Sequence, residues 1–177
     1  SRPYFLYVGS RTKAYKNFDG LLYAFSKVAI ANPHPILVVV GKYFNKEEKR
    51  LIEHLDIASR IMVYGCVNDR HLAKLYRCAE AFVYPSLYEG FGIPPLEAMI
   101  CGTVVIASNT SSIPEIVGDA AILFEPTALD ELAEILIHIL DSPGCHDRLV
   151  SKGYKQAQKF SWRKTAEETM QAYRALL

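Results

Sequence analysis

Six short apolar runs, separated by segments with helical periodicity, are the feature that most constrains the fold of this chain. The runs are rich in β-branched and aromatic residues, and they are nearly continuous in apolar character. Parallel strands that are buried on both faces have this composition, whereas half-exposed strands alternate between apolar and polar residues. We therefore expect strands at Tyr4–Val8, Ile36–Val40, Ile61–Tyr64, Ala81–Tyr84, Val104–Ala107 and Ala121–Phe124.

The segments between these runs carry apolar residues at helical spacing together with signals for helix starts. Helices are expected around residues 21–29, 72–79 and 129–140. Asp69 is a plausible N-cap for the second of these helices. Ser112 and Glu115 have the spacing of a capping box, with a proline in the first turn.

Six strands alternating with helices indicate an α/β domain with a Rossmann-like parallel sheet and helices on both faces. We interpret residues 1–177 as one domain with a helical tail from about residue 145, bent near residues 161 and 162. Ligands bind such sheets beyond the carboxyl ends of the strands. The loops that could hold a site are therefore residues 9–17, 41–46, 65–69, 85–95 and 108–115.

The loop after the first strand, VGSRTKAYKNF, combines a turn glycine with three cations. Gly9 is followed by Arg11, Lys13 and Lys16, and a helix is expected to open near Asn17. Free N–H groups and the dipole at a helix N-terminus add to side-chain charge in binding anions. The loop is neither a G-x-G-x-x-G fingerprint nor a G-x-x-x-x-G-K loop. By itself it is equally well interpreted as a solvated basic loop.

Residues 86–102, SLYEGFGIPPLEAMICG, place two glutamates on either side of glycines and prolines. A helix start near Pro94 or Pro95 would put Glu97 in the first turn and Glu89 in the preceding loop. Glycines in that loop let main-chain N–H groups approach a ligand closely. Two carboxylates around such amides suit a polyhydroxylated ligand, because carboxylates accept hydrogen bonds from hydroxyls and amides donate to hydroxyl or phosphate oxygens. The alternative is a dipole-favoured carboxylate at Glu97 and a solvated side chain at Glu89.

These motifs together resemble a known family. EGFGIPPLE is similar to the glutamate–seven residues–glutamate motif of the retaining group-one glycosyltransferases, which have the two-domain GT-B architecture. YVGSRTKAYKNFDGLLYAF resembles that family's phosphate-contacting loop and following helix, and SIPEIVGDAAILFEP resembles its segment beyond the fifth strand. The similarity runs from about residue 4 to Trp162 and covers only the C-terminal, donor-binding half. It implies that the N-terminal, acceptor-binding domain is absent from this chain.

In this resemblance three residues would carry the chemistry. Arg11 and Lys16 match the cations that hold the diphosphate of a nucleotide sugar, with Gly9 in the turn and Lys13 as an alternative to Arg11. Glu89 matches the glutamate that faces the transferred sugar. The implied reaction transfers the sugar to an acceptor with retention of anomeric configuration. The cations and a helix N-terminus would stabilise the charge that builds on the departing diphosphate.

Other residues would bind the donor in this resemblance. Glu97 matches the glutamate that binds the ribose hydroxyls, and the segment after the third strand matches the wall of the base pocket. Amides of the glycine-rich loop would lie near the sugar. The substrate-binding residues expected in this way are Gly9, Gly65, Cys66, Val67, Gly90, Phe91, Gly92 and Glu97.

No cofactor and no metal site are expected beside the nucleotide sugar, which is a substrate. The chain has no Asp-x-Asp pair, and its five histidines are scattered. Two alternatives use the same cleft: a non-catalytic nucleotide-sugar-binding module, and half of a GT-B epimerase or phosphorylase. A phosphoacceptor signalling domain would need acidic residues just after the first strand, where this chain has Arg11 and Lys13.

Composition and charge limit the partners and the location. A formal net charge of +1 argues against a broad nucleic-acid-binding face. The expected partners are a nucleotide sugar and, through the absent domain, a saccharide or lipid-linked acceptor. The four cysteines are interpreted as reduced, mostly buried thiols. With no signal peptide and no bilayer-length apolar run, we expect a cytoplasmic protein, with peripheral membrane association of the longer protein as an alternative.

Overall fold

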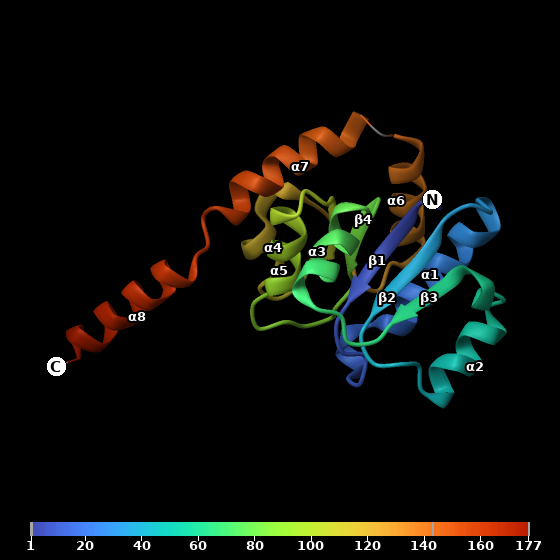
Figure 1. Cartoon of the computed structure of the whole chain (residues 1–177), viewed down its shortest axis with the longest axis horizontal. Coiled ribbons are helices and arrows are strands. Elements are labelled where there is room, and N and C mark those ends of the chain that lie inside the picture. Colours follow the sequence, from blue (N-terminus) through green and yellow to red (C-terminus); the bar gives the residue numbers. More distant parts are fainter. Residues whose placement is uncertain (1, 143, 177) are drawn as a thin grey trace.

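The computed structural model describes residues 2–142 and 144–176 and contains a six-stranded sheet flanked by helices (Figure 1). The strands are β1 (Tyr4–Val8), β2 (Ile36–Val40), β3 (Ile61–Tyr64), β4 (Ala81–Tyr84), β5 (Val105–Ser108) and β6 (Ala121–Phe124). The helices are α1 (Phe18–Ala31), α2 (Lys46–His54), α3 (Asp69–Arg77), α4 (Ile93–Ile100), α5 (Ile113–Val117), α6 (Leu129–Asp141), α7 (Gly144–Ala157) and α8 (Trp162–Ala175). Short 3-10 turns are η1 (Ala14–Lys16), η2 (Ala58–Arg60) and η3 (Gly118–Ala120).

Every strand lies parallel to its neighbours, in the order β3-β2-β1-β4-β5-β6. The prediction of a Rossmann-like parallel sheet is confirmed. The fifth strand was predicted at 104–107 and lies one residue later, because Ser108 extends the ladder by pairing with Phe124. The strand order reverses between β1 and β4, and doubly wound sheets bind ligands in the crevice at such a reversal.

Helices cover both faces of the sheet and create two hydrophobic cores. On one face α1, α2 and α6 pack over Phe5 and Tyr7 of β1. On the other face α3, α4, α5 and α7 pack over Leu6 of the same strand. Successive residues of a strand point to opposite faces, so a strand between two cores must be apolar at every position. This requirement explains the continuous apolar runs in the sequence.

Two helix starts and one helix cap differ from the predictions. The N-cap of α3 is Asn68, whose side chain accepts a hydrogen bond from the amide of His71, and Asp69 is the first residue inside the helix. α4 begins at Ile93, so Glu97 lies in the second turn and not in the first. The capping box predicted at Ser112 is wrong, because its hydroxyl bonds to a neighbouring loop and makes no cap bond to α5.

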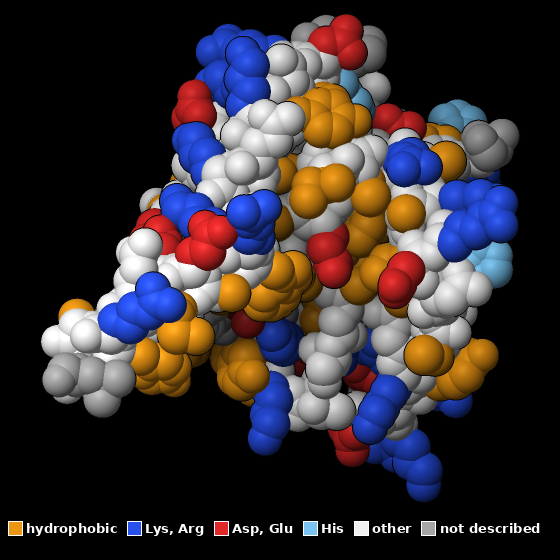
Figure 2. Space-filling view, turned by 60° about the vertical axis from the view of Figure 1, so that its left-hand side comes forward, with side chains coloured by type: hydrophobic (Ala, Val, Ile, Leu, Met, Phe, Trp, Pro, Cys, Tyr) orange, Lys and Arg blue, Asp and Glu red, His pale blue; other side chains and the backbone are white. Residues whose placement is uncertain are grey.

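The C-terminal part forms two helices with different surroundings. α7 packs on α4, and Gln156 near its end donates a hydrogen bond of 2.8 Å to the carbonyl of Ile116. α8 follows a break and projects away from the body of the domain (Figure 1). Its residues Trp162, Met170 and Tyr173 are 79%, 52% and 63% exposed. In Figure 2 the arm at the lower left accordingly carries hydrophobic side chains among charged ones.

The cysteines are less buried than the sequence suggested. Cys66 and Cys78 are exposed, because they lie in the loop after β3 and at the end of α3, and Cys101 is partly buried. The side chain of Cys145 lies outside the described residues. Within residues 2–142 and 144–176, no helix combines the length and apolar character needed to cross a membrane.

Candidate active site at the strand-order reversal

The loops after β1 and β4 meet where the strand order reverses, and hydrogen bonds join them. The amide of Leu87 donates to the carbonyl of Tyr15 at 2.7 Å. Asn17 has left-handed backbone geometry (φ 50°), and its side-chain amide donates to the carbonyls of Pro85 at 3.1 Å and Pro126 at 2.9 Å. A side chain at Gly20 would collide with that amide. Asn17 therefore ties the loop after β1 to the loops after β4 and β6.

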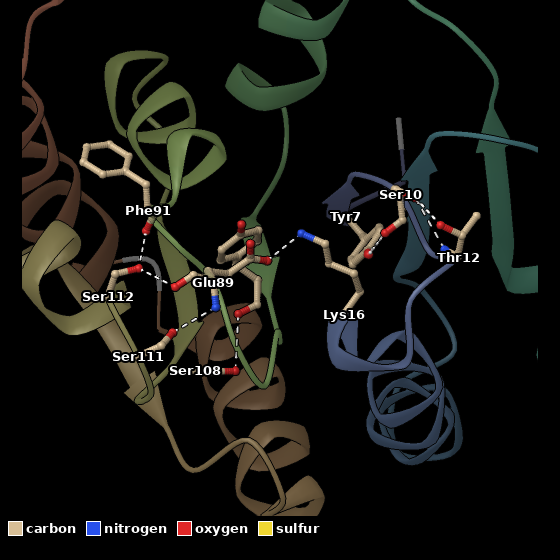
Figure 3. Close-up of polar contacts among 10 residues, drawn as sticks. Tyr7, Ser10, Thr12, Lys16, Glu89, Phe91, Ser108, Ser111 and Ser112 are labelled. Atoms are coloured by element: carbon tan, nitrogen blue, oxygen red, sulfur yellow. Dashed lines mark hydrogen bonds and ion pairs between the residues drawn. The ribbon is translucent and has the colours of Figure 1, made fainter.

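This arrangement brings Lys16 and Glu89 into contact from positions 73 residues apart. Lys16 Nζ lies 2.7 Å from Glu89 Oε1, and the two side chains are 20% and 11% exposed (Figure 3). Lys16 ends the η1 turn just before α1, and Glu89 lies in the loop before α4. The structure thus places two of the three predicted catalytic side chains side by side at the predicted edge of the sheet.

Arg11, the third predicted catalytic residue, lies deeper than Lys16. Its Nε donates to Glu48 Oε1 at 2.8 Å, and the two side chains are only 4% and 9% exposed. The guanidinium also donates to the carbonyl of Lys42 and stacks over the rings of Phe18 and Phe44 at 5.2 and 4.9 Å. Its Nη1 is buried without a hydrogen-bond partner among the described residues. A contact between Arg11 and a diphosphate stays a prediction; Lys13, the alternative, is exposed.

The partner of Arg11, Glu48, lies in the first turn of α2, just after the loop at residues 41–46, and the sequence analysis did not name it as a site residue. Glu48 forms a capping box with Asn45 at the start of α2, which the Asn-x-x-Glu spacing could have indicated. A Cβ added to Gly41 would lie 2.6 Å from the carbonyl oxygen of Gly9 and 3.0 Å from Arg11 Nη1. Gly41 has a φ of 154°, so glycine allows the loops after β1 and β2 to touch.

A buried tyrosine lies beside each glutamate of the motif. Tyr76 of α3 donates to Glu97 Oε2 at 3.1 Å. Burial, with a further contribution from Glu97, raises the pKa of the Tyr76 hydroxyl far above its ordinary value. Burial, followed by the hydrogen bond to Glu89, likewise raises the pKa of Tyr84. Both phenols therefore stay protonated at neutral pH, and the hydrogen bond from Tyr76 orients Glu97.

The glycine-rich loop between Glu89 and α4 is partly exposed to solvent. Gly90 is exposed, and nothing lies within 4 Å of a Cβ added to it. Gly92 precedes α4 with a φ of 129°, a conformation that other residues rarely adopt. The ring of Phe91 is 46% exposed and meets Phe160 edge-on at 5.9 Å. Gly90 and Phe91 are thus accessible to a ligand, whereas Gly92 is buried.

The residues predicted for the base pocket lie at the end of β3, beyond the loop after β2. Gly65 and Val67 are partly buried and Cys66 is exposed. A Cβ added to Gly65 would lie 3.5 Å from the ring of Tyr43, which is 74% exposed. Tyr43, from the loop after β2, is therefore a further aromatic side chain beside this candidate base site. The sequence analysis did not single it out.

Several polar residues that organise the site were not predicted as site residues. They support predicted site residues from distant parts of the chain, and periodicity cannot indicate such contacts. Among residues 2–142 and 144–176, no group of three His, Cys, Asp or Glu side chains is arranged to hold a metal ion. The missed residues are Asn17, Glu48, Tyr76, Tyr84, Ser111 and Ser112.

Comparison with known proteins decides the family. The model described as "Glycosyl transferases group 1" matches residues 1–156. The chain belongs to this family. The resemblance noted in the sequence is therefore confirmed, and the α/β domain corresponds to the C-terminal half of the GT-B architecture.

Similar proteins agree with this assignment. O-antigen chain mannosyltransferase B of Escherichia coli is 35% identical over 98% of this chain and 46% of its own length. MMP alpha-(1->4)-mannosyltransferase of Mycolicibacterium hassiacum is 35% identical over 89% of this chain and 39% of its own length. Sucrose-phosphate synthase from Thermosynechococcus elongatus superposes with a TM-score of 0.85 at 30% identity, covering 99% of this glycosyltransferase domain and 46% of that structure. The chain thus spans less than half the length of these relatives.

Proposed function

We propose that this glycosyltransferase domain binds a nucleotide-diphosphate sugar and presents it for transfer with retention of anomeric configuration. The observation that carries the proposal is the contact between Lys16 and Glu89 at the strand-order reversal, beside an open glycine-rich loop. A cation and a carboxylate in contact can bind two adjacent parts of one nucleotide sugar. The cation attracts the diphosphate, and the carboxylate accepts hydrogen bonds from sugar hydroxyls.

In the proposed reaction each charged side chain has one role. Departure of the diphosphate builds negative charge, which Lys16 and the N-terminus of α1 stabilise. Glu89 orients the sugar, and Glu97, held by Tyr76, binds the ribose hydroxyls. Because Lys16 and Glu89 pair with each other, a donor must bridge or separate them, and its phosphates and hydroxyls replace the lost contact.

We extend the proposal to the sugar and the acceptor. Two relatives that are 35% identical to this chain are named as mannosyltransferases, so mannose is the sugar we favour. The acceptor is proposed to be a saccharide or lipid-linked saccharide. Since the matched region is 46% of the E. coli relative, acceptor binding is assigned to a part of that architecture outside this domain. We keep a cytoplasmic location, with peripheral contact to the membrane surface, as part of this proposal.

A panel of nucleotides tests the function directly. We expect one nucleoside diphosphate among UDP, GDP and ADP, and its sugar conjugates, to raise the melting temperature of the 177-residue chain. A ligand at about 100 times its Kd stabilises the folded state by about 2.7 kcal/mol. Because side chains supply the positive charge, the shift should persist in EDTA. If no member of the panel shifts the melting temperature, the proposed function is refuted; a shift that EDTA abolishes would reveal a required metal.

Substitutions of the two glutamates should have different effects on binding of the nucleoside diphosphate and of the complete donor. Glu97→Gln is expected to weaken binding of both the nucleoside diphosphate and the complete donor, because the ribose is common to both. Glu89→Gln is expected to weaken chiefly the complete donor. Losing a hydrogen bond to a charged group costs about 1.5–3 kcal/mol, or roughly 10- to 150-fold in affinity. Calorimetry with each ligand measures the effect, and equal losses for both ligands in both variants would contradict this division of roles.

A further inference from the structure

The loop that carries Glu89 is held by two serines from the segment after β5 (Figure 3). Ser111 Oγ accepts a hydrogen bond from the amide of Glu89 at 3.0 Å. Ser112 Oγ lies 2.9 Å from the carbonyl oxygen of Glu89 and 2.7 Å from that of Phe91. A hydroxyl has one proton, so Ser112 shares it between two acceptors. Three main-chain groups of one short loop are thus bonded to two consecutive side chains.

The bonds from Ser112 fix the direction of the amides that the proposed function assigns to the donor. A peptide unit is planar and trans, so its N–H points opposite to its carbonyl. The carbonyl of Glu89 shares a plane with the N–H of Gly90, and the carbonyl of Phe91 shares a plane with the N–H of Gly92. Ser112 draws both carbonyls toward α5, which turns both N–H groups to the opposite side.

The same serine does not serve the helix that it precedes. Ser112 comes directly before α5 but makes no side-chain cap bond to it. Ser111 adopts left-handed backbone geometry (φ 51°), which directs two successive hydroxyls at the neighbouring loop. Thr110 adds a longer bond of 3.3 Å to the carbonyl of Leu87. The side chains of residues 110–112 are therefore bonded to the Glu89 loop, whereas only their main-chain carbonyls bond to α5.

We propose that Ser111 and Ser112 are positioning residues for donor binding, which hold Glu89 and the amides of Gly90 and Gly92 toward the transferred sugar. The proposal rests on the proposed function for its ligand. It goes beyond the motif itself, because it assigns the orientation of the Glu89 loop to a segment more than 20 residues further along the chain. The hydroxyls act through the loop and do not touch the donor.

The test compares Ser112→Ala, Ser112→Thr and Ser111→Gly with the wild-type chain. Ser111→Gly removes the other hydroxyl while tolerating the positive φ. Ser26→Ala is the matched control, because Ser26 Oγ also donates to a carbonyl, that of Tyr23, but within α1. Calorimetry measures Kd for GDP, GDP-mannose, UDP and UDP-glucose, and amide hydrogen exchange is followed at residues 88–92.

Ser112→Ala is expected to lower the affinity for the nucleotide sugar about five- to tenfold. Its affinity for the corresponding nucleoside diphosphate should stay within about twofold of the wild-type value. Ser112→Thr should restore the wild-type ratio, and Ser111→Gly should resemble Ser112→Ala. Exchange at residues 88–92 should accelerate in Ser112→Ala and not in Ser26→Ala. If Ser112→Ala does not fold, Ser111→Gly decides by the same measurements.

Two results overturn the inference. If amide exchange at residues 88–92 is unchanged in the variants, the serines do not position the loop. If the ratio of the affinities for nucleotide sugar and nucleoside diphosphate is unchanged, the positioning has no role in sugar binding. Failure of the proposed function looks different. A wild-type chain that binds none of the four probes, and neither ADP nor its sugar conjugates, refutes that function and the donor role together, while accelerated exchange in Ser112→Ala would still establish that the serines hold the loop.

Discussion

Lys16→Ala is expected to weaken binding of the nucleoside diphosphate by roughly 10- to 150-fold, because a hydrogen bond to a charged group is lost from the centre of the site. Lys16 Nζ contacts Glu89 at 2.7 Å, so its removal also leaves that carboxylate without its cation. Because the two side chains are 20% and 11% exposed, we also expect a lower melting temperature, though a smaller decrease than in Arg11→Ala, whose ion pair is 4% and 9% exposed. Isothermal calorimetry with the nucleotide selected by the panel measures the loss.

Substitutions of two other basic residues, Lys27 and Arg11, show whether the effect of Lys16→Ala is specific to the site. Lys27→Ala removes an exposed lysine that pairs with Asp130 on the surface, and it should leave nucleotide affinity unchanged. Arg11→Ala should behave differently from both. It breaks an ion pair that is almost fully buried, so we expect about 3–5 kcal/mol of destabilisation in addition to weaker binding. Unchanged nucleotide affinity in Lys16→Ala and Arg11→Ala would remove this loop from the site.

The 177-residue chain is expected to bind the nucleotide sugar and to transfer the sugar at least about a hundredfold more slowly than a version that carries the N-terminal half of its relatives. Transfer needs the acceptor hydroxyl beside the anomeric carbon, and positioning can account for ~7–11 kcal/mol of a barrier. The matched region is 46% of the E. coli mannosyltransferase. Closure of two domains would also exclude water from the reacting groups.

The exposed apolar side chains of α8 agree with this expectation. Trp162, Met170 and Tyr173 are more than half exposed on a helix that projects from the domain. The measurement is a transfer assay on both forms with the same donor and acceptor, after donor binding to each has been verified. Comparable turnover would require a complete active site within residues 1–177. Donor binding without glycosylated product in the longer form would favour a binding module, or an epimerase or phosphorylase half.

Continuous apolar runs and helical spacing were sufficient to predict the architecture of this domain. Strands between two helix layers are buried on both faces, so their composition reflects the fold directly, and the predicted strand bounds agree with those observed except for a one-residue shift at β5. Helix starts were less accurate. Asn68 and Asp69 are both good caps, and Ser112 has capping-box spacing yet bonds to a different loop.

The sequence by itself determined the fold class, the family motifs and the loops that could hold the site, because each depends on residues close together in the chain. Only the tertiary structure decided which side chains meet. Lys16 and Glu89 are 73 residues apart, Arg11 and Glu48 are 37 apart, and Ser112 and Glu89 are 23 apart. Such contacts depend on strand order and on the paths of loops at one edge of the sheet. Local propensity and periodicity do not encode these paths, because they arise from the packing of the whole domain.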